Sequence, residues 1–252
     1  MEFIGDVARK KGSGSLLATE ATKTKLAAEI GRASSLFYVP QVLNFDRDKG
    51  VLELERLSGL VTLLQLAIDK DARLVELSER AGAALAVIHE QLVLPDEMKH
   101  ELPPEWMDGS DKNVFIHGDF ACINLCLHEP SGRLVILDWS TAPIMGRTPT
   151  FGSRYFDVLW FVGCAFRGAP GRRIFSWNAE KMADTFFKGY VRTASAERLE
   201  NFVDYLPKIY RLQRKKVWHL ARQRSALRAA AYIFHQLFMY AHFYTFLHSY
   251  RL

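Results

Sequence analysis

The stretch from residue 116 to residue 139 gathers side chains that could hold a metal ion and accept a proton. Asp119 stands five residues before Asn124, and Asp138 follows an apolar run further along. Mg²⁺ prefers oxygen ligands, and it takes one or two protein carboxylates together with the phosphates of a substrate. A carboxylate and an amide oxygen beside a second carboxylate are therefore typical of a site for a magnesium-bound nucleotide.

Two short apolar segments between Asn124 and Asp138 should bring these side chains together. Residues 125–127 and 134–137 favour β-strand, and a Glu-Pro-Ser-Gly sequence between them is a turn signal. A hairpin folded at Ser131 puts position 124 opposite position 138, because both are seven residues from the turn centre. We expect the amide and the carboxylate to converge at the open end of this hairpin.

The order His-Gly-Asp from residue 117, then Asn124, then Leu-Asp-Trp up to Trp139 resembles the aminoglycoside phosphotransferase/choline kinase family, which has a protein-kinase-like fold. The resemblance implies an enzyme that uses ATP and Mg²⁺ to move the γ-phosphoryl group to a hydroxyl of a small-molecule or glycan acceptor. Asp119 would orient that hydroxyl, and Asn124 and Asp138 would hold Mg²⁺. His117 would support the catalytic loop, and Trp139 would pack beneath it.

A lysine near the N-terminus should hold the nucleotide phosphates. Residues 7–10, Val-Ala-Arg-Lys, fit the V-A-x-K strand whose lysine contacts the α- and β-phosphates. A helix expected over residues 22–34 carries Glu29, which we predict to pair with Lys10 and keep it aimed at phosphate. Lys23 shares that helix and is a poor candidate for the phosphate lysine. Because V-A-x-K is a short pattern, solvated surface charges remain the alternative for Lys10 and Glu29.

The remainder of the N-terminal region should form a second hairpin that leads to an adenine-binding hinge. Residues 39–43 and 51–54 read as its strands, and the resemblance implies that backbone groups near Glu55 and Leu57 contact adenine. The family places two strands and a phosphate-covering loop before the lysine strand, whereas only nine residues precede Lys10. We therefore expect a shortened N-terminal lobe, either because the chain is truncated at its start or because it lacks the loop.

The sequence predicts an α+β, bilobal fold. Residues 1–57 would form a small β-rich nucleotide-binding lobe, and residues 58–252 a larger, mainly helical lobe with the catalytic loop and the acceptor site. In this second lobe, Asp157 occupies the place where the family braces the catalytic loop through its backbone amides. An aspartate that caps a helix N-terminus is the alternative reading.

Composition and charge describe the partners. The chain has a net charge of +5, and from Tyr205 to Leu252 it contains nine Lys or Arg residues and no Asp or Glu. This basic, aromatic region fits an anionic or amphiphilic acceptor better than a polycation, and it could contact a membrane surface, although core packing is the simplest role for its aromatic residues. A cytoplasmic protein is expected, because no apolar run reaches the ~20 residues of a membrane span, no signal peptide is evident and the three cysteines form no disulfide framework.

Two other classes of protein remain open. The short N-terminal lobe favours a kinase-like pseudoenzyme that binds a nucleotide or a partner without efficient turnover. The basic composition suggests nucleic-acid binding, but no recognised binding motif accompanies it, and a solvated helix face explains the charges.

Overall fold

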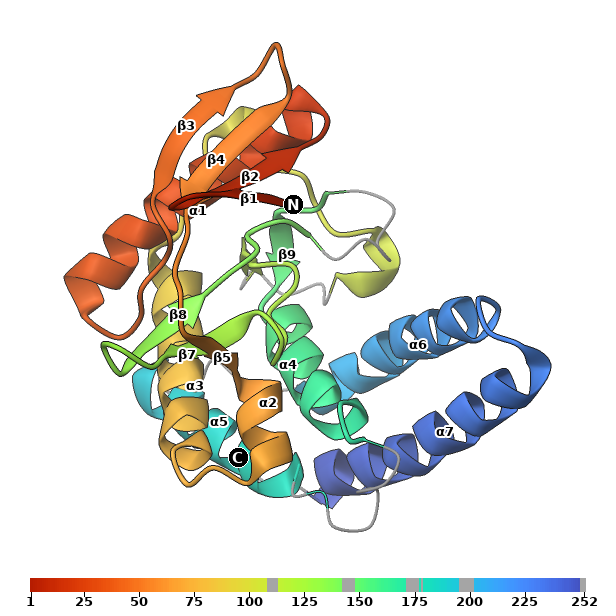
Figure 1. The fold of residues 1–252 in the computed structure, drawn as a ribbon. Helices are drawn as coiled ribbons and strands as arrows, with labels where there is room; N and C mark the ends of the chain where they lie inside the picture. Colours follow the sequence, from red (N-terminus) through yellow and green to blue (C-terminus); the bar gives the residue numbers. More distant parts are fainter. Residues whose placement is uncertain (108–112, 142–147, 171–176, 178, 195–201, 250–252) are drawn as a thin grey trace.

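The computed structural model describes residues 1–107, 113–141, 148–170, 177, 179–194 and 202–249. Figure 1 shows a small sheet with one long helix stacked on a larger, mainly helical part. This two-lobed α+β architecture confirms the predicted fold class.

The N-terminal sheet presents the phosphate lysine candidate on an inner strand. Its four antiparallel strands have the order β1-β2-β4-β3 and span Glu2–Ile4 (β1), Val7–Lys11 (β2), Val42–Asp46 (β3) and Val51–Glu55 (β4). Lys10 lies on β2, opposite the fully buried Leu52 of β4. One short strand, β1, precedes the lysine strand, and the turn between them uses Gly5 with a φ of 54°.

Helix α1 (Gly14–Ser34) packs across this sheet and is longer than predicted. We expected it to begin at residue 22, whereas it begins eight residues earlier. Ser13 stands at the N-cap without a side-chain hydrogen bond, and the first turn has no acidic residue, so the usual signals of a helix start are missing. Leu17 and Ala21 of this added part pack with Leu52 in a small core of their own.

The larger lobe combines short strands with six helices among the described residues. Its strands are β5 (Leu60–Thr62), β6 (Asn113–Phe115), β7 (Leu125–His128), β8 (Arg133–Ile136) and β9 (Phe151–Ser153). Its α-helices are α2 (Leu63–Asp69), α3 (Leu74–Gln91), α4 (Tyr155–Arg167), α5 (Ala179–Thr193), α6 (Phe202–Ala221) and α7 (Ala226–Ser249), with single 3-10 turns at Asp96–Met98 and Pro104–Trp106.

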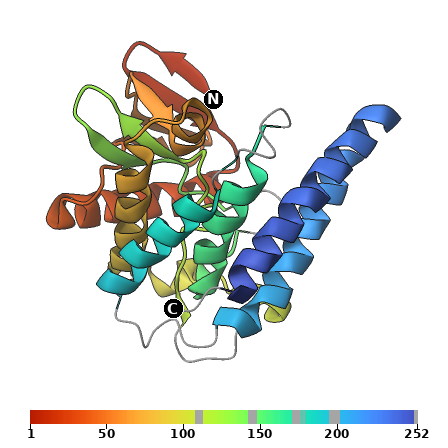
Figure 2. The same cartoon turned by 90° about the horizontal axis from the view of Figure 1, so that it is seen from below.

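The buried core surrounds α4, which carries Asp157. Helices α3 and α5 pack closely side by side (Figure 2), and glycine allows their approach. A Cβ added to Gly82 of α3 would lie 2.0 Å from the Phe186 carbonyl oxygen, and one added to Gly189 of α5 would lie 1.9 Å from that of Glu79. Within α4, nearly every side chain from Tyr155 to Phe166 is buried, so this helix gives Asp157 a rigid support.

The predicted β-hairpin forms, with a register one residue different from the prediction. Leu125 pairs with Ile136, and the Leu137 N–H donates to the Asn124 carbonyl oxygen at 2.8 Å. Position 124 is therefore opposite 137, not 138, because the four turn residues between β7 and β8 centre the turn half a residue before Ser131. Asp138 lies one residue beyond the ladder, with a φ of 55°.

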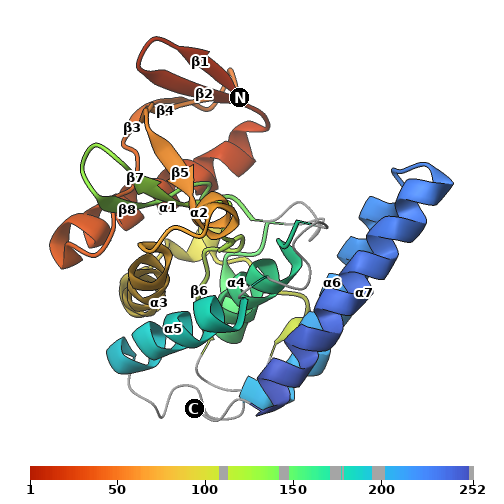
Figure 3. The ribbon, with the colours of Figure 1, turned by 60° about the horizontal axis from the view of Figure 1, so that its bottom comes forward.

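The last two helices form a long antiparallel hairpin along one side of the larger lobe (Figure 3). It contacts the core through α4, against which both α6 and α7 pack. Within the ranges described above, no helix has the combination of length and apolar character that crossing a membrane requires.

Candidate active site

A cavity of about 320 Å³ lies between the N-terminal sheet and the hairpin of β7 and β8. Lys10, Asn124 and Asp138 line its polar end, and Glu55 and Leu57 line it where β4 leaves the sheet. Apolar side chains complete the wall, among them Ala8, Leu54, Leu60 and Leu137. The cavity thus brings together residues near the N-terminus and residues about 130 positions later in the chain.

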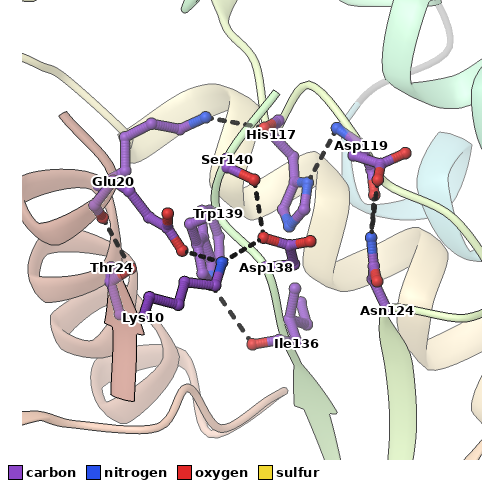
Figure 4. Close-up of polar contacts among 11 residues, drawn as sticks. Lys10, Glu20, Thr24, His117, Asp119, Asn124, Ile136, Asp138, Trp139 and Ser140 are labelled. Carbon is purple, nitrogen blue, oxygen red and sulfur yellow. Dashed lines mark hydrogen bonds and ion pairs between the residues drawn. The ribbon is translucent and has the colours of Figure 1, made fainter. Parts of the chain in front are cut away.

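Lys10 is held by two carboxylates. Its Nζ lies 2.5 Å from Glu20 Oε1 and 2.7 Å from Asp138 Oδ1. Figure 4 shows Lys10 between these two carboxylates. Burial works against the ammonium charge, but the nearby Glu20 and Asp138 carboxylates outweigh it and raise the pKa of Lys10. Burial also raises the pKa of Glu20, and Lys10 opposes that rise. Lys10 is therefore charged at neutral pH and directed toward Asp138.

The predicted pairing of Lys10 with Glu29 is wrong. Glu29 is exposed on α1, nine residues along the helix from Glu20, and Glu20 is the buried partner. Because α1 begins at Gly14 and not at residue 22, its first turns, which carry Glu20, approach β2. Its later turns, which carry Glu29, lie further along the helix. Thr24 supports the arrangement one turn on, with its hydroxyl donating to the Glu20 carbonyl oxygen at 2.7 Å.

A matched pair of variants separates these two acids. Glu20→Gln should weaken binding of Mg-ATP roughly tenfold or more, because it removes a buried charge-assisted bond that keeps Lys10 in place. Glu29→Gln changes the charge of the same helix by the same amount and should leave binding unchanged. Isothermal titration with an ATP analogue measures both. Equal weakening by the two variants would show that only the helix charge matters.

Asp138 and Asn124 offer the oxygens for a metal ion. The positive φ of Asp138 is uncommon for a residue with a side chain and is the kind of backbone strain that gathers at functional sites. Ser140 donates its hydroxyl to Asp138 Oδ1 at 2.7 Å. Although burial alone would raise it, the charge of Lys10 and these hydrogen bonds lower the pKa of Asp138. Asp138 is ionised at neutral pH and lies between Lys10 and Asn124 (Figure 4).

The donor set fits Mg²⁺ that is shared with a nucleotide. In the described parts of the chain, no three His, Cys, Asp or Glu side chains group to hold a metal ion by themselves. Mg²⁺ needs no such group, because it keeps several waters and takes further oxygens from phosphates. Asn124 donates both of its described side-chain bonds through Nδ2, to the carbonyl oxygen and the carboxylate of Asp119, so its amide oxygen is the atom suited to a cation.

Asp119 is held in a fixed orientation. Its Oδ1 accepts from Trp160 Nε1 at 2.7 Å, and its Oδ2 accepts from Asn124 Nδ2 at 3.1 Å. Burial raises the pKa of Asp119, while the Trp160 bond and the charge of Lys216 oppose that rise. Lys216 comes from α6, and its Nζ lies 4.5 Å from the centre of the Trp160 ring. Trp160 thus connects the Asp119 carboxylate with a cation of the last hairpin.

His117 and Trp139 are buried next to the loop that carries Asp119. The His117 ring is fully buried, and its Nδ1 accepts from the Asp119 backbone N–H at 3.2 Å. Burial, together with the Lys23 charge, lowers the pKa of His117 to about 4, so the ring is neutral at pH 7. Trp139 is buried with its ring 4.6 Å from that of His117, and its Nε1 donates to the Ile136 carbonyl oxygen at 3.3 Å.

Asp157 accepts hydrogen bonds from the loop backbone. The N–H groups of His117 and Gly118 donate to its two oxygens at 2.6 Å and 2.9 Å. His89 Nε2 lies 3.1 Å from the same carboxylate, and His89 Nδ1 lies 2.9 Å from the Tyr190 hydroxyl. Burial would raise the pKa of Asp157, but the bond and charge of His89 and the loop N–H of Gly118 outweigh it and lower the pKa. This aspartate is fully buried and charged, and it fixes the loop to α4.

The hinge residues lie at the edge of the cavity. The Glu55 backbone N–H donates to the Gln41 carbonyl oxygen at 2.8 Å, so it is already used within the N-terminal lobe. The Glu55 side chain accepts from the Tyr38 hydroxyl at 2.5 Å and turns toward β3. Any adenine contact at Glu55 therefore involves its carbonyl group, and Leu57 is the next lining residue that could donate an N–H.

Four residues of the site escaped the sequence reasoning. Glu20 lies on the unrecognised first part of α1, Lys23 lies on the predicted part but was given no role in the site, and Trp160 lies three residues after Asp157 on α4. Lys23 is almost fully buried, and its Nζ donates to the His117 carbonyl oxygen at 2.7 Å, while burial lowers its pKa to about 8. Lys216 reaches the Trp160 ring from a helix that begins 83 residues after Asp119 in the sequence, and no local pattern marks it.

Comparisons with known proteins support the fold. No protein-family model matches the chain, and no curated protein matches it in sequence. Among solved structures, it is similar to a choline/ethanolamine kinase family protein from Mesorhizobium loti, with 16% identity over 93% of this chain and 82% of the other, and a TM-score of 0.54. It is also similar to a glucosamine kinase in complex with glucosamine, ADP and inorganic phosphate, with 13% identity over 85% and 74% of the two chains and a TM-score of 0.51. At these identities the likeness shows a shared kinase-like fold.

Proposed function

We propose that the protein is an ATP-dependent phosphotransferase that moves the γ-phosphoryl group to a hydroxyl of a small molecule or glycan. The observation that carries this proposal is the single cavity lined by Lys10, Asn124 and Asp138, with the oriented carboxylate of Asp119 bonded to Asn124 beside it. A positioned base next to a phosphate-binding site is what phosphoryl transfer requires.

In the proposed reaction the acceptor oxygen forms a bond to the γ-phosphorus as the bond between that phosphorus and the bridging oxygen of ADP breaks. Asp119 accepts the hydroxyl proton and, because Trp160 and Asn124 hold both of its oxygens, it aligns the hydroxyl with the phosphorus. Its main contribution is positioning, since the transition state is loose and demands little basicity. Lys10, fixed by Glu20, holds the α- and β-phosphates.

Asn124 and Asp138 would hold Mg²⁺, which neutralises charge on the phosphate oxygens when bound. Glu55 and Leu57 would contact adenine through backbone groups where they line the cavity. His117, Trp139 and Asp157 keep the loop in register, because their bonds and packing fix its backbone.

An anionic acceptor is favoured over a polycation. Lys216 lies over the ring of Trp160, which bonds to the carboxylate that would receive the acceptor hydroxyl. Burial lowers the pKa of Lys216, with the charge of Arg167 acting in the same direction and that of Asp119 opposing. These two partly buried cations would gain from an anionic group close to the reacting hydroxyl. A phosphorylated sugar or a lipid-linked glycan has both groups.

The direct test is an acceptor panel assayed for Mg²⁺-dependent ATP consumption and for the phosphorylated product. The panel should include phosphorylated and unphosphorylated sugars, choline, glucosamine, an aminoglycoside and a glycolipid. We expect turnover with an acceptor that carries an anionic group. Turnover only with a polycation would overturn the preference for an anion.

A nucleotide-binding protein without turnover is the second candidate. The cavity lined by Lys10, Asn124 and Asp138 suits nucleotide binding whether or not transfer follows. Binding of Mg-ATP without consumption on any member of the panel would support this candidate.

A further inference from the structure

Helix α7 leaves a broad apolar face open to solvent. Its inner face packs on α4 through buried residues such as Phe243, whose ring lies 5.5 Å from that of Phe166. Its outer face exposes four large apolar side chains, Leu227 (83% exposed), Phe234 (72%), Leu237 (60%) and Tyr244 (46%). A helix that is apolar on more than one face is normally buried on each of them. The outer face of α7 therefore has the composition of a buried surface, although it is exposed to solvent.

The exposed positions form one stripe. Together with the exposed Ala230 and Ala241, the four large residues are spaced alternately by three and four positions from 227 to 244. This spacing keeps side chains on the same side of a helix over several turns. The stripe is therefore continuous along most of α7.

A cationic face of α6 accompanies this stripe. Residues 211, 214, 215 and 218 of α6 and residue 222, one position beyond its end, are all exposed. Their spacing puts them on one side, because the Arg222 N–H still donates to the Trp218 carbonyl oxygen in the helical pattern. Four of them are Arg or Lys, and the fifth is Trp218, which is 52% exposed. Long cationic side chains around an exposed indole are typical of helices that lie at a membrane surface.

The two faces adjoin along the contact between the helices. The ring of Tyr210 on α6 lies 5.4 Å from that of Tyr244 on α7. Burial raises the pKa of Tyr240 on α7 to about 12, and the charge of Arg214 on α6 is near enough to oppose that rise. We call the combination of the α6 cations, Trp218 and the α7 stripe the hairpin surface.

We propose that the hairpin surface docks on a membrane that contains anionic lipids. Cations, an indole and an apolar stripe match the charged, interfacial and acyl layers of such a membrane, in which Trp and Tyr favour the headgroup level. A second copy of the chain fits less well, because the segment from Tyr205 to Leu252 has nine cations and no acid, and two such surfaces repel each other. The proposal does not depend on the proposed phosphotransferase activity.

Vesicle flotation tests the proposal with the full chain. Vesicles of phosphatidylcholine alone are compared with vesicles in which part of this lipid is replaced by phosphatidylglycerol. We expect binding to the anionic vesicles, weakened by added salt, and little binding to the neutral ones. Arg214→Gln and Lys215→Gln should each weaken binding roughly fivefold, the effect of one cation at such a surface.

Variants of the stripe and matched controls complete the test. Phe234→Gln and Leu237→Gln alter exposed side chains and should reduce vesicle binding without changing the thermal unfolding midpoint. Val93→Gln removes an equally exposed apolar group elsewhere, and Lys25→Gln an exposed cation on α1, so neither should have an effect.

Four results would overturn the proposal. Equal binding to neutral and anionic vesicles would show that the protein does not recognise anionic lipids. Unchanged binding by the hairpin variants would show that the hairpin surface does not bind the vesicles. A dimer in analytical ultracentrifugation that Phe234→Gln dissociates, with no vesicle binding, would assign the stripe to a second copy. Binding to polyglutamate but not to vesicles would assign it to an acidic protein partner.

Discussion

Asp119→Asn should lower phosphoryl transfer by roughly 10²- to 10⁴-fold, the usual contribution of a positioned acid or base. Asparagine keeps the shape of the side chain, yet it has one oxygen where the carboxylate uses two, for the N–H groups of Trp160 and Asn124. It also cannot accept the proton of the attacking hydroxyl. The acceptor found with the panel, assayed at saturating ATP, gives the loss in kcat.

Nucleotide binding should survive this change, and that separates the role of Asp119 from a general loss of structure. Asp119 is absent from the lining of the cavity that holds Lys10 and Asp138, and its described hydrogen bond toward that cavity is the one from Asn124. The dissociation constant of an ATP analogue should therefore stay within about threefold of the wild type, less than the tenfold that 1.4 kcal/mol would produce. Wild-type turnover by Asp119→Asn would show that Asp119 takes no part in the transfer.

Asp157→Asn should destabilise the protein by about 3 to 5 kcal/mol, because it removes one partner from a buried charged network. The fully buried carboxylate accepts the N–H groups of His117 and Gly118 and faces His89 Nε2. An amide there turns one –NH₂ toward another donor, so at least one of these groups loses its acceptor. Urea unfolding followed by circular dichroism measures the loss, and kcat should fall with it as the loop shifts.

The acid dependence of stability provides a second readout for Asp157. Its pKa is lowered in the folded protein, so the charged carboxylate stabilises the fold above its unfolded pKa of about 3.9, and this stability is lost as the pH falls through the folded value. The variant should lack that loss below about pH 4. Asp184→Asn on α5 is the control, because this half-exposed aspartate faces Lys188 in a surface pair and contributes about 1 kcal/mol or less. Equal destabilisation by the two variants would contradict a specific role for Asp157.

The fold class and the position of the β7–β8 hairpin could be predicted because their signals are local. Two short apolar runs around a Pro-Ser-Gly turn determine a hairpin within a short window. The order of His117, Asp119, Asn124 and Asp138 restricts the topology around it. The register differed by one residue, because composition identifies a turn but not its centre. That difference leaves Asp138 outside the ladder, where its backbone takes a positive φ.

The partner of Lys10 could not be predicted for a related reason. Helix α1 begins without a side-chain cap or an early acid, so the sequence signal for its start appears eight residues too late. The choice between Glu20 and Glu29 depends on that start, because it decides which turns of α1 face β2. Lys216 could not be predicted for another reason. Its approach to Trp160 depends on how the last hairpin packs on α4, and this contact joins residues 56 positions apart.

The central claim is that Asn124 and Asp138 hold a magnesium-bound nucleotide against Lys10, and Mg²⁺-dependent binding tests it without any acceptor. Isothermal titration of a non-hydrolysable ATP analogue is carried out with Mg²⁺ and with EDTA, on the wild type and on Asp138→Asn. Asparagine tolerates the positive φ of this position, so the variant changes the charge while the backbone conformation is kept. We predict that Mg²⁺ tightens binding to the wild type and that Asp138→Asn loses this gain. Binding that is equally strong in EDTA, or that Mg²⁺ still tightens in the variant, would contradict the claim.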